Sequence, residues 1–174
     1  MYLRRRRVHV SEASTAELQK PAEEEVRSLS AVLEYQFGRG AARLLEGDVK
    51  VRRSPSTGRP REVYVNGVLV GTVRATDSFF VPTVEGARRL LDLLPHPRLR
   101  VVVPSEVAEY VAKGRTVFCK HVVEADAEIR PGEEVFVVDT SGKLIALGKA
   151  VVGGLEILSK KAGKAVKVRK GVEK

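Results

Sequence analysis

Two prolines that flank a single histidine, Pro95 and Pro97, interrupt the chain just past its midpoint. Proline fixes its own φ and disfavours the helical conformation in the residue before it, so a helix cannot cross this point and we expect an extended connector. The interruption therefore predicts a domain boundary at residue 96 or 97. It divides the chain into an arm at 1–22, a domain at 23–96 and a domain at 97–174.

The arm carries four consecutive arginines, Arg4 to Arg7, and few apolar residues. Such a composition favours a basic, mobile segment, although an ordinary solvated terminus explains it equally well.

The segment 23–96 predicts an α+β domain. Apolar residues recur at three- and four-residue steps over 26–37 behind an acidic first turn, which indicates an amphipathic helix. Alternating apolar residues over 49–81 predict strands, with Asn66 and Gly67 as a two-residue hairpin turn. Thr83 can cap a last helix, which the two prolines end.

The segment 97–174 predicts a small β barrel with one helix. Ser105 is expected to cap the helix at 106–113, and Gly114 to close it. Short runs of apolar residues predict five strands, around 99–103, 117–123, 135–139, 144–150 and 165–169. Short strands separated by turn residues are typical of such barrels, so the fold class is α+β throughout.

The composition favours a polyanionic partner. Lys and Arg number 31 against 22 Asp and Glu, which gives a net charge of +9. We therefore expect nucleic acid as the partner. The sequence has neither the apolar run of a membrane span nor that of a signal peptide, so we expect a cytoplasmic protein that does not enter membranes.

The sequence gives little support to catalysis or metal binding. A single cysteine and the absence of spaced histidine pairs argue against a metal site, and we expect no cofactor. Cys119 and His121 would share one face of a strand and could form a dyad, but a buried, packing cysteine is the favoured interpretation. Asp77 is better explained as a turn residue than as a catalytic carboxylate. The expectation is therefore a protein that is not an enzyme by itself.

The strongest functional pattern is positive charge near the carboxyl end. Residues 159–174 hold seven basic residues and one acidic residue, and 165–169 alternate so that Lys167 and Arg169 stand together on the outer face of a strand. A basic face on a regular strand fits RNA phosphates, whereas a solvated basic tail is the alternative. The basic residues concerned, besides Lys167 and Arg169, are Lys160, Lys161, Lys164 and Lys170.

Four sequence segments of the second half occur in an order that resembles the PUA domain, the RNA-binding pseudo-barrel of pseudouridine synthases and archaeosine transglycosylases. They are EYVAKGRTVFCK (109–120), IRPGEEVFVV (129–138), LIALGKA (144–150) and VKVRKG (166–171). In the first half, YQFG (35–38) and TVRATDSFFVPT (72–83) resemble the α+β pre-PUA module of archaeal tRNA-guanine transglycosylases and of a small ribosome-biogenesis family. The resemblance implies a pre-PUA domain followed by a PUA domain.

The resemblance also implies where RNA binds: Lys113, Gly114 and Arg115 after the helix, Lys120 on the next strand, and Lys167 and Arg169 on the last strand. This sequence differs from the transglycosylases in one respect. Their catalytic (β/α)₈ barrel takes about 200–250 residues, and only the residues before 97 are available for it here.

Three functions follow as hypotheses. The first is a non-catalytic protein that recognises structured RNA, either tRNA or precursor rRNA, in RNA modification or ribosome biogenesis. The second is the RNA-binding subunit of a split tRNA-modifying enzyme such as a transglycosylase, with a protein partner that supplies catalysis. The third is a protein-interaction module whose basic charge is incidental.

Overall fold

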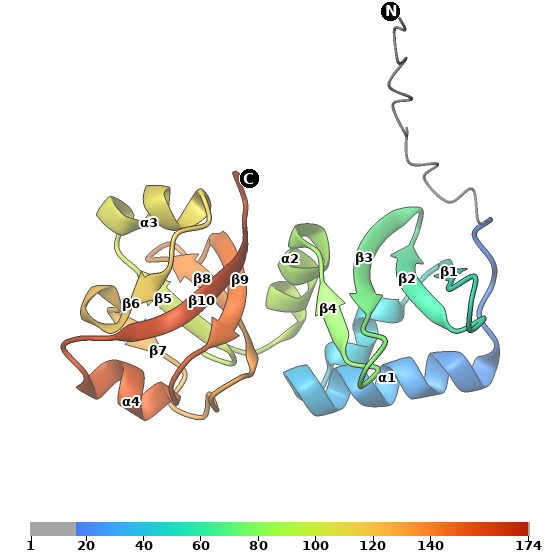
Figure 1. The fold of residues 1–174 in the computed structure, drawn as a ribbon, viewed down its shortest axis with the longest axis horizontal. Helices are drawn as coiled ribbons and strands as arrows, with labels where there is room; N and C mark the ends of the chain where they lie inside the picture. Colours follow the sequence, from blue (N-terminus) through green and yellow to red (C-terminus); the bar gives the residue numbers. More distant parts are fainter. Residues whose placement is uncertain (1–16, 174) are drawn as a thin grey trace, which may run out of the picture.

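The computed structural model describes residues 17–173, which form two α/β halves side by side (Figure 1). The α+β fold class expected from the sequence is confirmed. Among these described residues, no helix is both long enough and apolar enough to span a bilayer.

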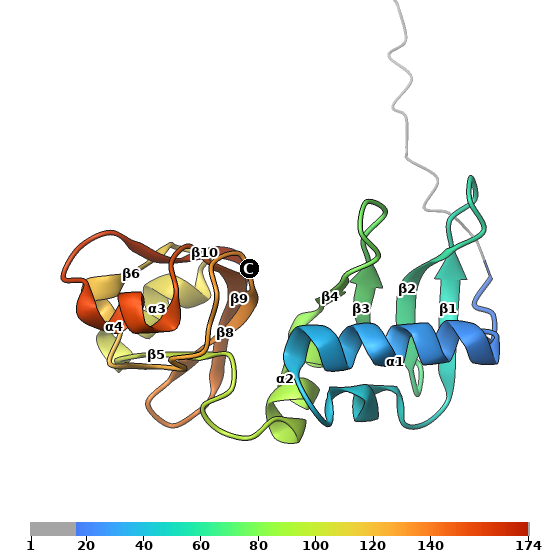
Figure 2. The same ribbon diagram turned by 90° about the horizontal axis from the view of Figure 1, so that it is seen from below.

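The first half is a four-stranded antiparallel sheet in the order β1-β2-β3-β4, with α1 lying across one face (Figure 2). Its elements are α1 (Glu23–Phe37), the 3₁₀ helix η1 (Ala41–Leu45), β1 (Val49–Arg53), β2 (Pro60–Val65), β3 (Val68–Val73), β4 (Phe80–Pro82) and α2 (Val84–Leu93). The buried residues of α1 are Leu29, Leu33 and Phe37, which lie four residues apart and therefore share one face of the helix.

The second half is a six-stranded mixed sheet in the order β6-β10-β9-β8-β5-β7, in which only β5 and β8 are parallel neighbours. Its elements are β5 (Arg100–Val103), α3 (Ser105–Ala112), β6 (Val117–Phe118), the 3₁₀ helix η2 (Cys119–His121), β7 (Glu124–Ala125), β8 (Glu134–Asp139), β9 (Leu144–Ala150), α4 (Gly154–Ser159) and β10 (Lys164–Gly171).

Chain length forces this second sheet to curl. Strands β6 and β7 are the two edges, which would lie about 24 Å apart across a flat six-stranded sheet. The chain passes from Phe118 at the end of β6 to Glu124 at the start of β7, six residue steps that span about 20 Å when fully extended and less with η2 among them. The sheet must therefore roll up, which gives the pseudo-barrel.

Two features that depend only on neighbouring residues, a hairpin turn and a helix cap, were predicted correctly from the sequence. Asn66 and Gly67 both have positive φ, as the predicted hairpin turn requires. The hydroxyl oxygen of Thr83 accepts a hydrogen bond from the backbone N–H of Gly86, as expected of a helix cap.

Two predictions for the second half were wrong, and one helix was missed. Helix α3 begins at Ser105 itself, with Pro104 at the cap position and no side-chain cap, because proline already supplies the extended conformation before the first turn. The strand expected over 117–123 is instead the two-residue strand β6 followed by η2, and the next strand, β7, begins only at Glu124, since this segment has to cross the end of the barrel. Helix α4 was not anticipated, and six residues are too short to show helical periodicity.

The connector between the halves is a tight turn and not the extended segment that the prolines suggested. The backbone N–H groups of Arg98 and Arg100 donate to the carbonyls of Pro95 and Pro97, both at 2.9 Å. The side chain of Arg98 also donates to the carbonyl of Phe37, whose ring stacks against that of Phe136 in β8 with 6.0 Å between centroids. The buried apolar residues of both halves therefore form one continuous cluster.

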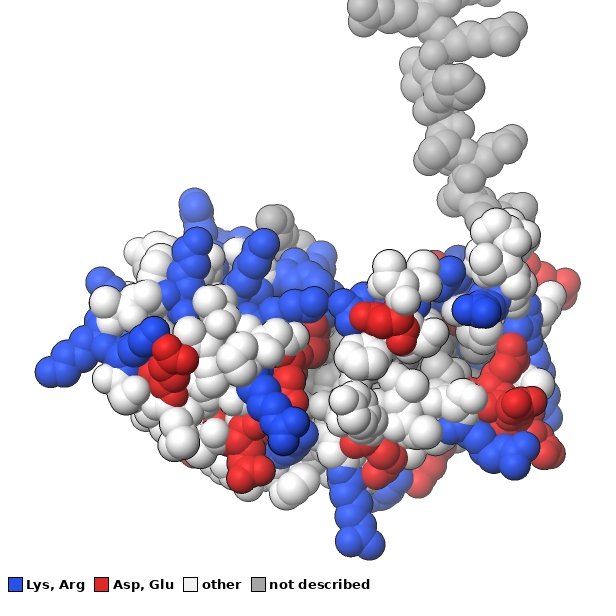
Figure 3. Space-filling model, turned by 60° about the horizontal axis from the view of Figure 1, so that its bottom comes forward, with Lys and Arg blue, Asp and Glu red and all other residues white. Residues whose placement is uncertain are grey.

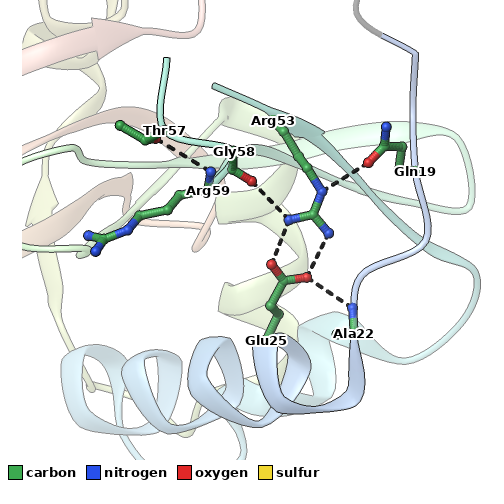
Figure 4. Close-up of polar contacts among 7 residues, drawn as sticks. All are labelled: Gln19, Ala22, Glu25, Arg53, Thr57, Gly58 and Arg59. Carbon is green, nitrogen blue, oxygen red and sulfur yellow. Dashed lines mark hydrogen bonds and ion pairs between the residues drawn. The ribbon is translucent and has the colours of Figure 1, made fainter. Parts of the chain in front are cut away.

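The last residues of the predicted arm are attached to the first sheet. Gln19 forms an isolated antiparallel bridge with Val51 of β1, and its side chain accepts a hydrogen bond from Arg53. The guanidinium of Arg53 also makes two hydrogen bonds to the carboxylate of Glu25, at 2.6 and 2.8 Å, and one to the carbonyl of Gly58 (Figure 4). Arg53 therefore joins α1, the β1–β2 loop and the segment before α1. The arginine cluster at 4–7 lies outside the described residues.

This ion pair predicts an acid-sensitive contribution to stability. Hydrogen bonds from Arg53, and a further one from the backbone N–H of Ala22, hold the pKa of Glu25 below its usual range, although burial opposes them. A carboxyl with a lowered folded-state pKa adds stability above its unfolded pKa and loses it as the pH falls through the folded value. We therefore expect the unfolding free energy of the native protein to decline between about pH 5 and pH 3.

The measurement is urea unfolding at a series of pH values for the native protein and for Glu25→Gln. Glu25→Gln should lower the free energy of unfolding by about 1 kcal/mol at pH 7, and this free energy should decline less steeply in acid than that of the native protein. Parallel pH profiles for the two proteins would contradict the assignment.

Candidate nucleic-acid interface

Strand β10 connects the segments that carry the predicted basic residues. The first residues of β10 pair with β6, so that Lys164 lies opposite Phe118 and Val166 lies opposite Val117 in the register. At this end of β10 the backbone N–H of Cys119 also donates to the carbonyl of Gly163. The loop that carries Lys160 and Lys161, and Lys164 at the start of β10, therefore lie beside η2, which carries Lys120.

The other end of β10 lies against the end of α3. A Cβ atom on Gly171 would come within 1.9 Å of the carbonyl oxygen of Ala112, and the backbone N–H of Glu173 donates to that same carbonyl. Lys113, Gly114 and Arg115 follow Ala112 directly and thus lie next to Lys170. With Lys167 between the two ends, the basic strip comprises Lys113, Arg115, Lys120, Lys160, Lys161, Lys164, Lys167 and Lys170.

Most cations in the basic strip lack a carboxylate partner. Lys113 pairs with Glu109 at 2.8 Å and Lys160 pairs with Glu156, and each carboxylate raises the pKa of its lysine. The other six make no ion pair with any residue in the range 17–173, and all eight side chains belong to exposed residues. In Figure 3 lysine and arginine side chains project from the carboxyl-terminal half around its margin. The basic strip can therefore attract phosphates along its length.

Arg169 does not stand free beside Lys167 as the alternation predicted. A bulge between Val168 and Lys170 breaks the regular register of β10 with β9. The guanidinium of Arg169 is bound by the carboxylate of Glu134, whose side chain is only 7% exposed, and it donates to the carbonyl of Pro82 in the first half. Its charge is largely neutralised, and its position joins the two halves.

The strand predicted to carry Lys120, Cys119 and His121 is the 3₁₀ helix η2, so the shared-face argument for a Cys–His dyad was wrong. Cys119 is buried, as its packing interpretation expected.

Asp77 accepts a hydrogen bond from the backbone N–H of Phe79 and pairs with Arg74, which is the behaviour of a turn residue. No group of three or more potential metal ligands occurs within 17–173.

Sequence reasoning missed Lys149. This exposed residue of β9 lies directly opposite Lys167 of β10 on one side and opposite Glu134 of β8 on the other. Glu134 is paired with Arg169, and Lys149 makes no ion pair with the described part of the chain. The sequence places Lys149 in a strand, but strand order and register determine its neighbours.

Comparison with known protein families agrees with this architecture. Residues 27–97 match the family "Patch-forming domain C2 of tRNA-guanine transglycosylase", and residues 99–172 match the PUA domain. These two matches follow one another along the chain in the order that the sequence resemblance implied.

Curated relatives include the tRNA-guanine(15) transglycosylases of Thermococcus onnurineus and Pyrococcus abyssi. They are 42% and 44% identical over 90% and 89% of this chain, which spans only 27% and 26% of their lengths. A hypothetical protein from Pyrococcus horikoshii has a similar fold, with a TM-score of 0.73 and 27% identity, covering 91% of this chain and 96% of that one.

The matched part of the transglycosylases is their carboxyl-terminal portion, about a quarter of each enzyme. The chain therefore consists of a domain that matches the patch-forming C2 domain of tRNA-guanine transglycosylase, followed by a PUA domain.

Proposed function

We propose that this protein binds structured RNA through the basic strip along β10 and contributes RNA recognition, not catalysis, to tRNA modification. The observation that carries the proposal is the arrangement of six cations that are exposed and free of carboxylate partners among residues 17–173, drawn from segments about 50 residues apart. Unpaired cations in a row bind a phosphate backbone without desolvating an existing ion pair.

Transfer RNA is the preferred RNA, because the curated relatives are named tRNA-guanine(15) transglycosylases. The chain corresponds to about a quarter of those enzymes, so we propose that it acts with a catalytic partner chain of that class, in the cytoplasm where tRNA is modified. Precursor rRNA is the competing RNA. A tRNA transcript should therefore bind more tightly than an rRNA fragment of equal length, and the reverse order would favour a role in ribosome biogenesis.

The basic strip is tested by removing two of its unpaired lysines. Lys164→Ala with Lys167→Ala should weaken tRNA binding and flatten the slope of log K against log salt by roughly 0.7–0.9 per lost phosphate contact. Folding should be almost unaffected, since exposed substitutions usually change stability by less than about 0.5 kcal/mol. Filter binding over a salt series measures both quantities.

The matched control is Arg27→Ala with Arg39→Ala, two exposed cations of the first half that make no ion pair within the described range. The control removes the same charge from a different surface. Equal weakening and equal loss of slope in both double variants would leave only diffuse polycation binding and overturn the localised interface.

A further inference from the structure

A second candidate binding site lies between the two halves. The C-terminal end of α1, the β3–β4 loop, the 128–134 segment and strands β9 and β10 enclose a cleft of about 640 Å³. Its volume is within the range of roughly 300–1,000 Å³ that is typical of small-ligand pockets. The cleft faces the viewer between the two halves in Figure 3.

One wall of the cleft is an exposed aromatic corner. Tyr35 on α1 is 79% exposed, so its ring is accessible to a ligand in the cleft. Its neighbour is Phe79 of the β3–β4 loop, with 6.0 Å between the ring centroids and 58° between the ring planes. Two tilted rings form a corner in which a flat aromatic group can stack on one ring and meet the other.

This corner is held rigidly. Gln36 donates to the carbonyl of Phe80 at 3.1 Å and accepts from its backbone N–H at 2.7 Å, which fixes α1 against β4. The guanidinium of Arg74 lies 5.4 Å from the centroid of the Phe79 ring and pairs with Asp77 at 2.7 Å. The backbone segments that carry the two rings are thereby held together before any ligand arrives, which lowers the entropy cost of binding.

The opposite wall carries both cations and carboxylates, and Glu128 is among its acidic residues. Lys149 and Arg130 line the cleft, are exposed, and have no side-chain partner among residues 17–173. Glu133, which also lines the cleft, has one carboxylate oxygen accepting from the backbone N–H of Arg130. Lys149 faces Lys167 of the basic strip across β9 and β10, and two like charges directly opposite repel each other unless an anion lies between them.

The cleft thus presents an aromatic platform on one wall and, on the other, two cations without an ion-pair partner among residues 17–173, of which Lys149 lies opposite Lys167 of the basic strip. A nucleotide combines the two features that these walls recognise, a flat base and a phosphate. We propose that the cleft binds one unpaired nucleotide of the RNA, with its base against Tyr35 and Phe79 and its phosphate against Lys149 and Arg130. This inference rests on the proposed RNA binding and adds single-nucleotide recognition to it.

The test uses the full chain and a series of hairpin RNAs in which one bulged 2-aminopurine is moved stepwise along the stem. For at least one position, binding should quench the 2-aminopurine fluorescence, and the bulged hairpin should bind at least about five-fold more tightly than the same hairpin without a bulge. Tyr35→Ala should abolish both effects and leave binding of the bulge-free hairpin unchanged. Tyr35→Phe should retain both effects because the ring remains.

Tyr110→Ala is the matched control, since Tyr110 is 64% exposed on α3 and lies outside the cleft. It should retain the bulge preference. If no bulge position is quenched or preferred, or if Tyr35→Ala keeps the preference, the nucleotide site is wrong, while binding of the bulge-free hairpin through the basic strip still stands. If the protein binds none of these RNAs and no tRNA transcript, the proposed function itself fails.

Discussion

Replacing Gly86 with alanine is expected to lower the free energy of unfolding by about 3 kcal/mol or more. In the interior of a helix, alanine is more favourable than glycine by about 1 kcal/mol. Helix propensity alone therefore predicts that Gly86→Ala would raise the free energy of unfolding. A Cβ atom at Gly86 of α2 would, however, lie 1.8 Å from the carbonyl oxygen of Val70 in β3. Neither atom belongs to a flexible side chain, so the helix would have to move away from the sheet.

Urea unfolding of Gly86→Ala measures this loss, with Gly58→Ala as the control. Gly58 has a φ of +68° and open space where a Cβ would lie, so its replacement should cost only the conformational strain of about 1 kcal/mol. A Gly86→Ala protein as stable as the native protein would show that α2 does not pack this closely on β3.

Replacing Arg100 with methionine should cost about 3 kcal/mol and weaken the coupling between the two halves. Arg100 lies in β5 and is only 9% exposed, and its guanidinium donates to the carbonyls of Leu91, Leu94 and Pro95 at 2.7, 3.2 and 3.0 Å. Burial lowers the pKa of this guanidinium, but arginine remains charged in proteins. Methionine retains much of the apolar volume and leaves those carbonyls without their donor.

Calorimetry should show a lower unfolding temperature for Arg100→Met and a broader or divided transition, because the turn between the halves loses its internal support. Arg98→Met is the comparison: it removes a more exposed side chain, with one hydrogen bond to the carbonyl of Phe37 and a long ion pair of 3.9 Å with Asp126, and it should cost less, about 1 kcal/mol. Equal losses in the two variants would contradict the role assigned to Arg100.

The sequence predicted the elements whose determinants lie within a few residues. The helix over 23–37, the Asn66-Gly67 turn and the Thr83 cap depend on periodicity, positive φ and a neighbouring N–H, and all three were correct. The Ser105 cap and the strand over 117–123 were wrong because a preceding proline and the closure of a barrel override local preference.

The candidate nucleic-acid interface, too, could be predicted only in part from the sequence. The abundance of basic residues over 159–174 could be read directly, because charge does not depend on folding. Which of these cations are free to bind RNA could not be predicted from the sequence, because their partners are distant in sequence. Arg169 is bound by Glu134, 35 residues away, whereas Lys167 faces Lys149 and carries its charge unpaired by any carboxylate in the described range.

The sequence by itself therefore determined two α+β segments, a break between them and an excess of positive charge toward the carboxyl end. Only the tertiary structure decided that the halves share one core, that the basic residues form a strip along β10, and that Tyr35 and Phe79 meet across 44 residues of sequence. The physical reason is that secondary structure and charge follow from short-range interactions. Register, burial and clefts follow from how distant segments pack.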